Sequence, residues 1–253
     1  MFSWLKRRRR RKLLREPFPE KWRPSLEEVR LYAQLAPQQR AQLEEILRII
    51  IAEKHWEECG GMSITDEVKV VIAALAAVPL INLRHDYYRN VMSILVYPDT
   101  FKVPNRQIQA GGIVHEGSTS TLGLASMQGP VVLAWDAVRR GNENAEDGRN
   151  VVLHEFAHKL DMLDRFADGA PPLGSRQQYR AWARIMNEEY DHLREQIRKG
   201  RRTLLDRYGA INPAEFFAVA TEHFFEQPRQ MRRKHEELYG LLVEYYRQDP
   251  AGR

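Results

Sequence analysis

The chain has 253 residues, of which 43% are hydrophobic, and its formal net charge is +5. This length suits one large domain with a core of its own. Cys59 is the single cysteine, which excludes an internal disulfide and favours a reducing compartment. No apolar run approaches the roughly 20 residues of a membrane span. We therefore expect a cytoplasmic monomer rather than a secreted or membrane-spanning protein.

The first 20 residues are strongly basic. Residues 6–15 hold eight Lys and Arg and no acidic residue, and subtracting these eight charges from +5 leaves −3 for the rest of the chain. The segment lacks the apolar region of a secretory signal. We expect residues 1–20 to form a flexible tail before one domain at residues 21–253, with an arm that touches phosphate or lipid headgroups as the alternative. Direct DNA binding is not expected, because it needs cations spread over a folded face with aromatic residues between them.

Apolar residues at helical spacing dominate residues 25–59. Pro37 interrupts the pattern, so we expect two helices there. Ser25 and Glu28 have the spacing of a capping box for the first helix, and Gly60 is expected to end the second.

The next segment, "SITDEVKVVIAALAAVPLINL", predicts a core helix. Thr65 is placed as its N-cap, and acidic residues follow in the first turn. The remainder is too apolar for a surface helix, and we expect the helix to end near Pro79.

From residue 92 the pattern changes to short β-branched runs. "MSILVYP" and "GPVVLAW" are bounded by Pro and Gly, as strands are. Between them, residues 110–129 are rich in Gly, Ser and Thr and predict a hairpin or a long surface loop. Residues 139–150 are polar and predict a connection.

The last third is helical. Residues 175–200 space their apolar side chains along one side and stop at Gly200, and further helices are expected within 212–228 and 234–250. Helices at both ends of the chain around a small central sheet predict an α+β domain.

The stretch "VVLHEFAHKLD" places His154 and His158 four residues apart. On a helix these side chains lie one turn above each other, close enough to share one zinc ion, and Glu155 lies beside them, where its carboxylate can accept a proton from a zinc-bound water. The surrounding residues are apolar nearly all round, so the helix is buried, and buried polar groups need partners. A hydrogen-bonded structural cluster without metal is the alternative.

Catalytic zinc usually has a third protein ligand. Asp164 follows His158 by six residues, as the third ligand does in proteases that read H-E-x-x-H-x-x-G-x-x-H or its aspartate variant. Here Asp161 replaces the glycine that turns the chain, so on a continuing helix Asp164 points away from the metal. Asp161 lies about 10.5 Å beyond His154 along the axis. We expect it to form a hydrogen bond with His158 instead.

A second helix, at residues 212–228, offers four other candidates: Glu215, Glu222, His223 and Glu226. Glu215 and Glu222 are seven residues apart and share a face, whereas the other two are rotated off it. Spacing alone leaves both glutamates open. Glu215 also has a structural explanation, because Asn212 as N-cap and Pro213 at the first helical position make it part of a capping arrangement.

Two specific motifs, "VVLHEFAHKLDMLD" and "YGAINPAEFFAVATEHFFEQP", are accompanied by looser matches such as "EPFPEKWR", "ILVYPDTF" and "GPVVLAWD" along nearly the whole chain. With these motifs the sequence resembles the Mlc titration factor A family, bacterial zinc peptidases whose catalytic core is similar to that of anthrax lethal factor. The resemblance implies a zincin-like fold. The arginine run lies outside the part that we can match.

The resemblance also implies roles for particular residues. It implies that His154, His158 and Glu215 bind Zn2+, and that Glu155 and Tyr208 are catalytic, whereas the sequence alone would make Tyr208 an ordinary aromatic residue at a helix end. Zinc would polarise the water and the scissile carbonyl, Glu155 would move the proton, and the tyrosine hydroxyl would donate to the oxygen that becomes negative. An edge strand, for which "GPVVLAW" is the candidate, would hold the peptide substrate by strand addition.

Two functions follow as hypotheses. The first is a zinc metallopeptidase, with an aminopeptidase favoured by the resemblance, which also implies binding to the Mlc repressor and regulation of sugar phosphotransferase genes. The second is a non-catalytic regulatory protein that sequesters a repressor and has a structural zinc site. Glu155 and Tyr208 favour the first, because a structural zinc site needs neither and is usually closed by four protein ligands.

Overall fold

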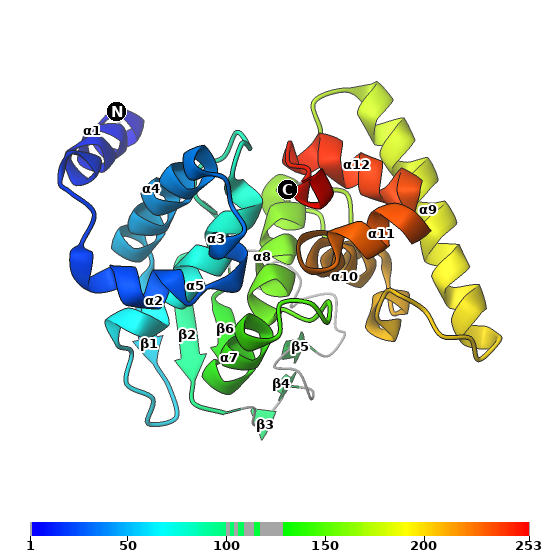
Figure 1. Cartoon of the computed structure of the whole chain (residues 1–253), viewed down its shortest axis with the longest axis horizontal. Helices are drawn as coiled ribbons and strands as arrows, with labels where there is room; N and C mark the ends of the chain where they lie inside the picture. The colour runs from blue at the N-terminus through cyan, green and yellow to red at the C-terminus, as the bar shows by residue number, and fades with distance from the viewer. Residues whose placement is uncertain (1, 100–101, 104–105, 109–113, 117–128, 253) are drawn as a thin grey trace.

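Helix α8 (Val151–Asp161) runs through the middle of the molecule, between the sheet with the N-terminal helices and the C-terminal helices (Figure 1). The computed structural model describes residues 2–99, 102–103, 106–108, 114–116 and 129–252. Within this part of the chain, no helix is both long and apolar enough to cross a membrane. The architecture is mostly helical with a small sheet beside α8, as the sequence predicts.

Five helices come from the N-terminal third: α1 (Phe2–Arg15), α2 (Arg23–Glu27), α3 (Arg30–Ala33), α4 (Pro37–Glu53) and α5 (Asp66–Ala77). The expected capping box is wrong, because α2 begins at Arg23 and Ser25 lies inside it. The expected second helix also ends early, and residues 55–58 form strand β1 (His55–Glu58). This segment is a strand because it pairs in parallel with residues 93–96, which lie far along the chain. The spacing of apolar residues within one segment gives no information about such a distant partner.

The predicted core helix is confirmed as α5. Thr65 is its N-cap and accepts a hydrogen bond from the Val68 backbone N–H. All residues from Val70 to Ala77 are buried, and a short 3₁₀ helix (Val78–Leu80) containing Pro79 follows. One continuous buried cluster extends from Leu26 to Ala251, so both halves of the chain share a core.

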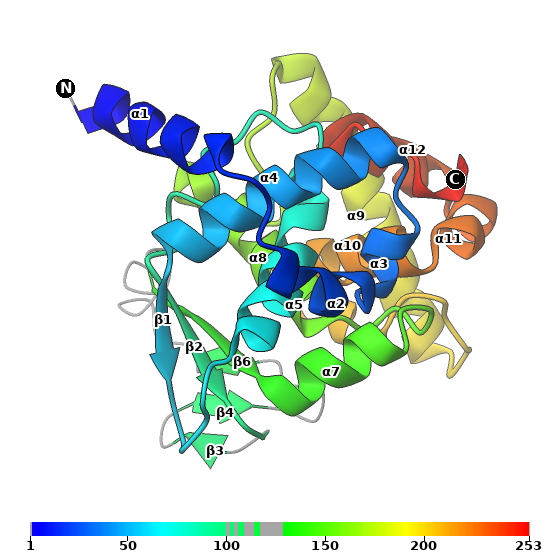
Figure 2. The ribbon, with the colours of Figure 1, turned by 60° about the vertical axis from the view of Figure 1, so that its left-hand side comes forward.

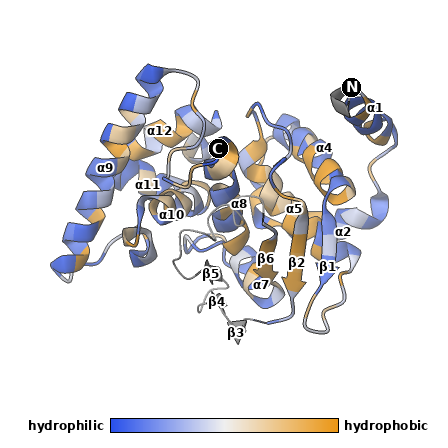
Figure 3. Cartoon of the chain, turned by 180° about the vertical axis from the view of Figure 1, so that it is seen from behind, coloured by the Kyte–Doolittle hydropathy of each residue, from blue (hydrophilic) through white to orange (hydrophobic). Residues whose placement is uncertain are grey.

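The main sheet has three parallel strands in the order β1-β2-β6, with β2 (Ser93–Tyr97) in the middle and β6 (Val131–Ala134) next to it. Both predicted strands are confirmed, and Figure 3 shows how apolar β2 and β6 are. A second, antiparallel sheet contains β3 (Lys102–Val103), β4 (Arg106–Ile108) and β5 (Val114–Glu116). Most of the segment expected to be a hairpin or loop, residues 110–129, lies outside the described residues.

Residues 139–150 were expected to be a polar connection, and this is wrong for the first of them. Helix α7 (Trp135–Glu143) begins directly after β6 and includes them. It forms because Ala137, Val138 and Gly141 are buried against the body, which supports a helix whose other face is polar. Only the short turn at residues 144–150 then leads into α8.

The C-terminal part packs on α8 from the other side. It contains α9 (Arg176–Arg198), α10 (Pro213–Glu226), α11 (Pro228–Lys234) and α12 (Glu236–Tyr246), with a 3₁₀ helix η4 (Arg207–Ala210) before α10. These helices confirm the sequence expectation for the last third. The Asn212 side chain caps α10 by accepting a hydrogen bond from the Glu215 backbone N–H at 2.9 Å, and Pro213 is the first helical residue.

The basic N-terminal segment is helical in the structure, which the sequence analysis did not foresee. Helix α1 lies beside α4 and extends past it (Figure 2). The Arg10 guanidinium bridges Glu53 on α4 and Asp86, with distances of 2.7 and 2.6 Å. Such charge-assisted contacts explain why this helix lies against the body. The division into a flexible segment 1–20 and a domain 21–253 stays a prediction.

Gly169 lies against three helices, α8, α9 and α10. Its N–H donates to the Asp161 carboxylate at the end of α8, at 3.0 Å, and its carbonyl accepts from Trp182 Nε1 on α9, at 2.8 Å. Its φ of +78° is one that L side chains rarely adopt, and an added Cβ would lie 2.3 Å from the Pro213 carbonyl oxygen at the start of α10.

We therefore expect Gly169→Ala to lower the free energy of unfolding by more than about 3 kcal/mol, from backbone strain plus displacement of α10. Gly200→Ala is the matched control, because Gly200 has a φ of +67° but nothing within 4 Å of its added Cβ. The control should lose only about 1–2 kcal/mol. Urea denaturation of both variants measures this, and equal losses would contradict the role given to the contact with Pro213.

Candidate metal centre

The two histidines of α8 point toward α10. The helix begins at Asn150, whose side chain accepts from the Leu153 N–H at 3.1 Å, and this cap sets where the helical register starts. His154 is fully buried, and the His158 ring lies 4.8 Å from the His154 ring, centroid to centroid. The expected convergence of residues four apart is present.

Glu215, at the third position of α10, completes a cluster with them. Its Oε2 lies 3.0 Å from His154 Nε2 and 3.3 Å from His158 Nε2, and the two imidazole nitrogens are 3.2 Å apart. His154, His158 and Glu215 thus offer three ligand atoms that all lie within 4.8 Å of one another. Sequence spacing left Glu215 and Glu222 open, and the structure brings Glu215 to the Nε2 side of both rings.

The dimensions of this triangle fit a metal ion. Tetrahedral zinc, bound to nitrogen and oxygen at about 2.0–2.2 Å, separates its ligand atoms by about 3.3–3.5 Å. The observed edges of 3.0, 3.2 and 3.3 Å are close to this separation. The three lone pairs also repel unless positive charge lies between them.

The pKa shifts of the cluster also favour positive charge between these side chains. Burial lowers the pKa of His154, but Glu222 and Glu215 outweigh burial and raise it to about 10. Burial raises the pKa of Glu215, but hydrogen bonds with His154 and His158 lower it well below the usual range of a carboxyl group. The cluster therefore stabilises a cation among these side chains.

Glu222 contacts the other ring nitrogen of His154 and is therefore not positioned as a ligand. One of its oxygens lies 2.8 Å from His154 Nδ1, and the other accepts a hydrogen bond from the Asn150 N–H at 2.5 Å. As the acceptor for Nδ1–H, it leaves the Nε2 lone pair of His154 directed at the cluster. Because Glu215 and Glu222 are seven residues apart on α10, one helix contacts both nitrogens of the same imidazole.

Tyr208 reaches the cluster from η4. Its ring centroid is 5.7 Å from that of His154. Burial raises its pKa, and the nearby carboxylates of Glu215 and Glu155 raise it further, so the hydroxyl keeps its proton. Asp206 caps η4 by accepting from the Tyr208 N–H at 2.9 Å, and it also accepts from the Arg149 guanidinium at 2.7 Å. Arg149 thus ties the segment carrying the tyrosine to the start of α8.

Glu155 follows His154 on α8 and is partly buried. Burial raises the pKa of its carboxyl group, and the charges of His154 and His158 oppose the rise. A raised pKa makes a carboxylate a stronger base than an ordinary one in water. Its position beside the cluster is the one that the sequence predicts.

Two further expectations concern the aspartates that follow His158. The expected hydrogen bond from Asp161 to His158 is wrong: Asp161 accepts from Gly169, and His158 Nδ1 has no partner among the described residues. Asp164 accepts from the Phe166 N–H at 3.1 Å and is not part of the cluster of His154, His158 and Glu215, although α8 ends at Asp161 and does not continue to it. Sequence reasoning missed Asn150 and Arg149, although an asparagine directly before an apolar helical run is a recognisable N-cap pattern.

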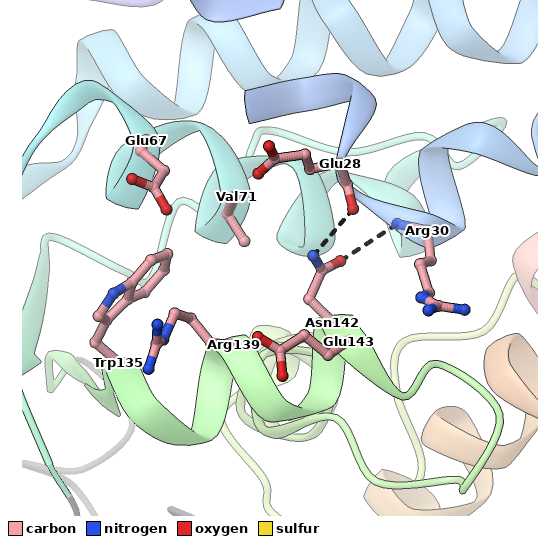
Figure 4. Close-up of a pocket in the computed structure, with 8 residues that line it drawn as sticks. All are labelled: Glu28, Arg30, Glu67, Val71, Trp135, Arg139, Asn142 and Glu143. Carbon is pink, nitrogen blue, oxygen red and sulfur yellow. Dashed lines mark hydrogen bonds between the residues drawn. The ribbon is translucent and has the colours of Figure 1, made fainter. Parts of the chain in front are cut away.

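A separate pocket of about 430 Å³ lies between α5, α7 and the α2–α3 junction and contains none of the predicted site residues (Figure 4). The Asn142 side chain crosses this junction, donating to the Glu28 carbonyl at 3.1 Å and accepting from the Arg30 N–H at 3.3 Å. These bonds hold α7, and therefore the end of β6, against the N-terminal helices.

A model of the glucose-regulated metallo-peptidase M90 family matches residues 4–247. The chain belongs to this family. As a member of the M90 family it is a metallopeptidase, and a metallopeptidase requires a metal ion. The match begins inside α1, so the expectation that the arginine run lies outside the family pattern is wrong.

Relatives of similar length support this assignment. An uncharacterised protein of Synechocystis sp. is 39% identical over 244 residues, which cover 96% of this chain and 89% of the relative. Mlc titration factor A of Edwardsiella ictaluri is 32% identical over 88% of this chain and 85% of its own length. Mlc titration factor A of Yersinia enterocolitica is 30% identical over 92% and 86%. The resemblance expected from the sequence is therefore confirmed.

We expect Glu222→Gln to weaken metal binding about 10- to 100-fold, because it disturbs the hydrogen bond that orients His154 without removing a predicted ligand. Titration of the metal-free protein with Zn2+ measures this. Glu226→Gln is the matched control on the same helix, since Glu226 accepts from the Asn150 side chain at 2.9 Å and from the Arg149 N–H at 2.9 Å. Equal affinities for both variants would contradict the orienting role.

Proposed function

We propose that this M90 peptidase is a zinc-dependent aminopeptidase of the HExxH type that acts in the cytoplasm. His154, His158 and Glu215 are the proposed zinc ligands, and Glu155 and Tyr208 the proposed catalytic residues. The observation that carries the proposal is the close triangle of Nε2, Nε2 and Oε2 atoms with Glu155 and Tyr208 beside it. The aminopeptidase preference is supported by the family resemblance of the sequence.

Each side chain has a task in peptide hydrolysis. A zinc ion supplies Lewis acidity that polarises water and the scissile carbonyl. Glu155 accepts the proton of the attacking water and delivers it to the leaving amine. Tyr208, which keeps its proton, donates a hydrogen bond to the carbonyl oxygen as this oxygen gains negative charge. Glu222 holds the His154 ring in place during these steps.

Strand β6 is the proposed substrate strand. In the described part of the chain it pairs with β2 alone, which supports its role as an edge strand that can accept a peptide by strand addition. It also contacts α8, the helix that carries two of the proposed ligands, and this contact supports the assignment. Such main-chain pairing binds peptides with little dependence on their side chains.

Glu155→Gln should lower kcat for peptide hydrolysis about 100- to 10,000-fold, because the amide cannot move the proton, while zinc content stays unchanged. Release of amino acids from unblocked peptides, with metal analysis of the same samples, measures both quantities. Glu188→Gln, at an exposed glutamate of α9, is the matched control and should keep full activity. A metal-loaded Glu155→Gln variant with normal kcat would remove Glu155 from the mechanism.

The aminopeptidase specificity has its own test. Peptides with an acetylated N-terminus should resist cleavage, because an aminopeptidase requires the free amine. Equal cleavage of blocked and free peptides would exclude an aminopeptidase while leaving the zinc chemistry intact.

A regulatory role is the second candidate, supported by the relatives named Mlc titration factor A. We expect a Mlc-type repressor to bind this chain equally well with Glu155→Gln, since the substitution leaves the surface unchanged. Capture of purified repressor by the wild-type, Glu155→Gln and metal-free proteins tests this. Capture by all three, combined with no peptide hydrolysis by the wild type, would favour the non-catalytic alternative, and no capture by any of them would exclude repressor binding.

A further inference from the structure

Helix α1 has one face toward the body and one toward solvent. On the inner face, Arg10 pairs with Glu53 and Asp86, and its guanidinium lies 4.2 Å from the centre of the Tyr87 ring. Arg48 of α4 donates to the carbonyl of Glu16 at the end of the helix, at 2.9 Å. These contacts determine which face remains outside.

The outer face is basic along its length. Positions 8, 11, 12 and 15 follow helical spacing, and with position 9 they supply five exposed cations: Arg8, Arg9, Arg11, Lys12 and Arg15. No carboxylate of the described chain is within ion-pair distance of these five. Their charges therefore face solvent.

Apolar side chains are exposed at the N-terminal end of the same face. The exposed fractions of Trp4 and Leu5 are 55% and 52%. The Arg8 guanidinium lies 5.6 Å from the centre of the Trp4 ring, so the aromatic ring and the cations form one surface. Figure 2 shows this end of α1 extending beyond the body, where it can approach a flat surface.

The net excess of positive charge of the chain lies on this helix. The chain has a net charge of +5, and the eight cations of residues 6–15 leave −3 for the remainder. A flat anionic surface therefore attracts α1 and weakly repels the rest, which orients the molecule with α1 toward that surface.

We propose that α1 binds the surface of an anionic lipid bilayer. Trp4 and Leu5 enter the headgroup region, and the outer cations face the lipid phosphates. A bilayer matches the surface better than a nucleic acid does, because the exposed apolar pair gains from leaving water and the cations lie on one short helix rather than over a folded groove. The proposal is independent of the peptidase chemistry.

The test uses the full chain and sedimentation with vesicles. Binding should occur with vesicles of phosphatidylserine and phosphatidylcholine, not with phosphatidylcholine alone, and should weaken as salt screens the charges. Each cation near an anionic surface strengthens binding about fivefold, so the triple variant Arg8→Gln, Arg11→Gln, Lys12→Gln should bind about 100-fold more weakly.

A matched triple variant controls for net charge. Arg232→Gln, Arg233→Gln, Lys234→Gln removes three exposed cations from α11 and should bind vesicles nearly as the wild type does. Lipids brominated on the acyl chains should quench tryptophan fluorescence in the wild type, and Trp4→Phe should lose this quenching. Unchanged melting temperatures verify that the variants are folded.

Three results would overturn the proposal. The first is equal binding to vesicles with and without phosphatidylserine, and the second is an equal loss of binding in the α1 and α11 variants. The third is retention of duplex DNA through the same cations by a protein that ignores vesicles, which would make α1 a nucleic-acid contact.

Discussion

The site depends on one buried imidazole whose two nitrogens are both engaged from the same helix. His154 has no exposed surface, and α10 provides Glu222 to its Nδ1 and Glu215 to its Nε2. A buried imidazole needs hydrogen-bond partners for its nitrogens. Here both partners are carboxylates, so they stabilise positive charge at or beside the His154 ring. His158 contributes its Nε2 to the same point, so the α8–α10 contact is a packing interface and also a cluster that could hold a metal ion.

That contact is held by interactions at its ends. Asn150 begins α8 with its own side chain, and its backbone N–H donates to Glu222 of α10. At the other end, Gly169 follows α8 closely enough to touch Pro213, where α10 starts. Ligand positions in a metal site must hold within fractions of an ångström, and two anchored helices achieve this more reliably than loops do.

Charge is distributed unequally between this centre and the surface. Buried carboxylates gather around α8 and α10, whereas the cations that make the chain basic are concentrated on α1. The proposed attraction to an anionic surface therefore acts on a helix that packs on α4, away from the proposed metal centre. The proposed membrane binding and the proposed peptide hydrolysis can then change independently, because they depend on different residues.

The sequence patterns predicted those elements that depend on interactions between residues close in sequence. Thr65 and Asn212 act as helix caps, the apolar run after Thr65 is a core helix, and the spacing of His154 and His158 directs both rings to one point. These outcomes depend on helical geometry and on side chains a few residues apart, which are readable along the chain. The family resemblance supplied the rest of the expected site.

Tertiary structure alone decided the remainder. Strand β1 exists because β2 pairs with it, and helix α1 lies against the body because Glu53 and Asp86 meet Arg10. Spacing alone left Glu215 and Glu222 open, and only the family resemblance pointed to Glu215. In the structure the rotation and axial position of α10 on α8 place Glu215 at Nε2 and Glu222 at Nδ1 of His154. Spacing determines which side chains share a face, but only the packing of two helices determines which carboxylate reaches which nitrogen.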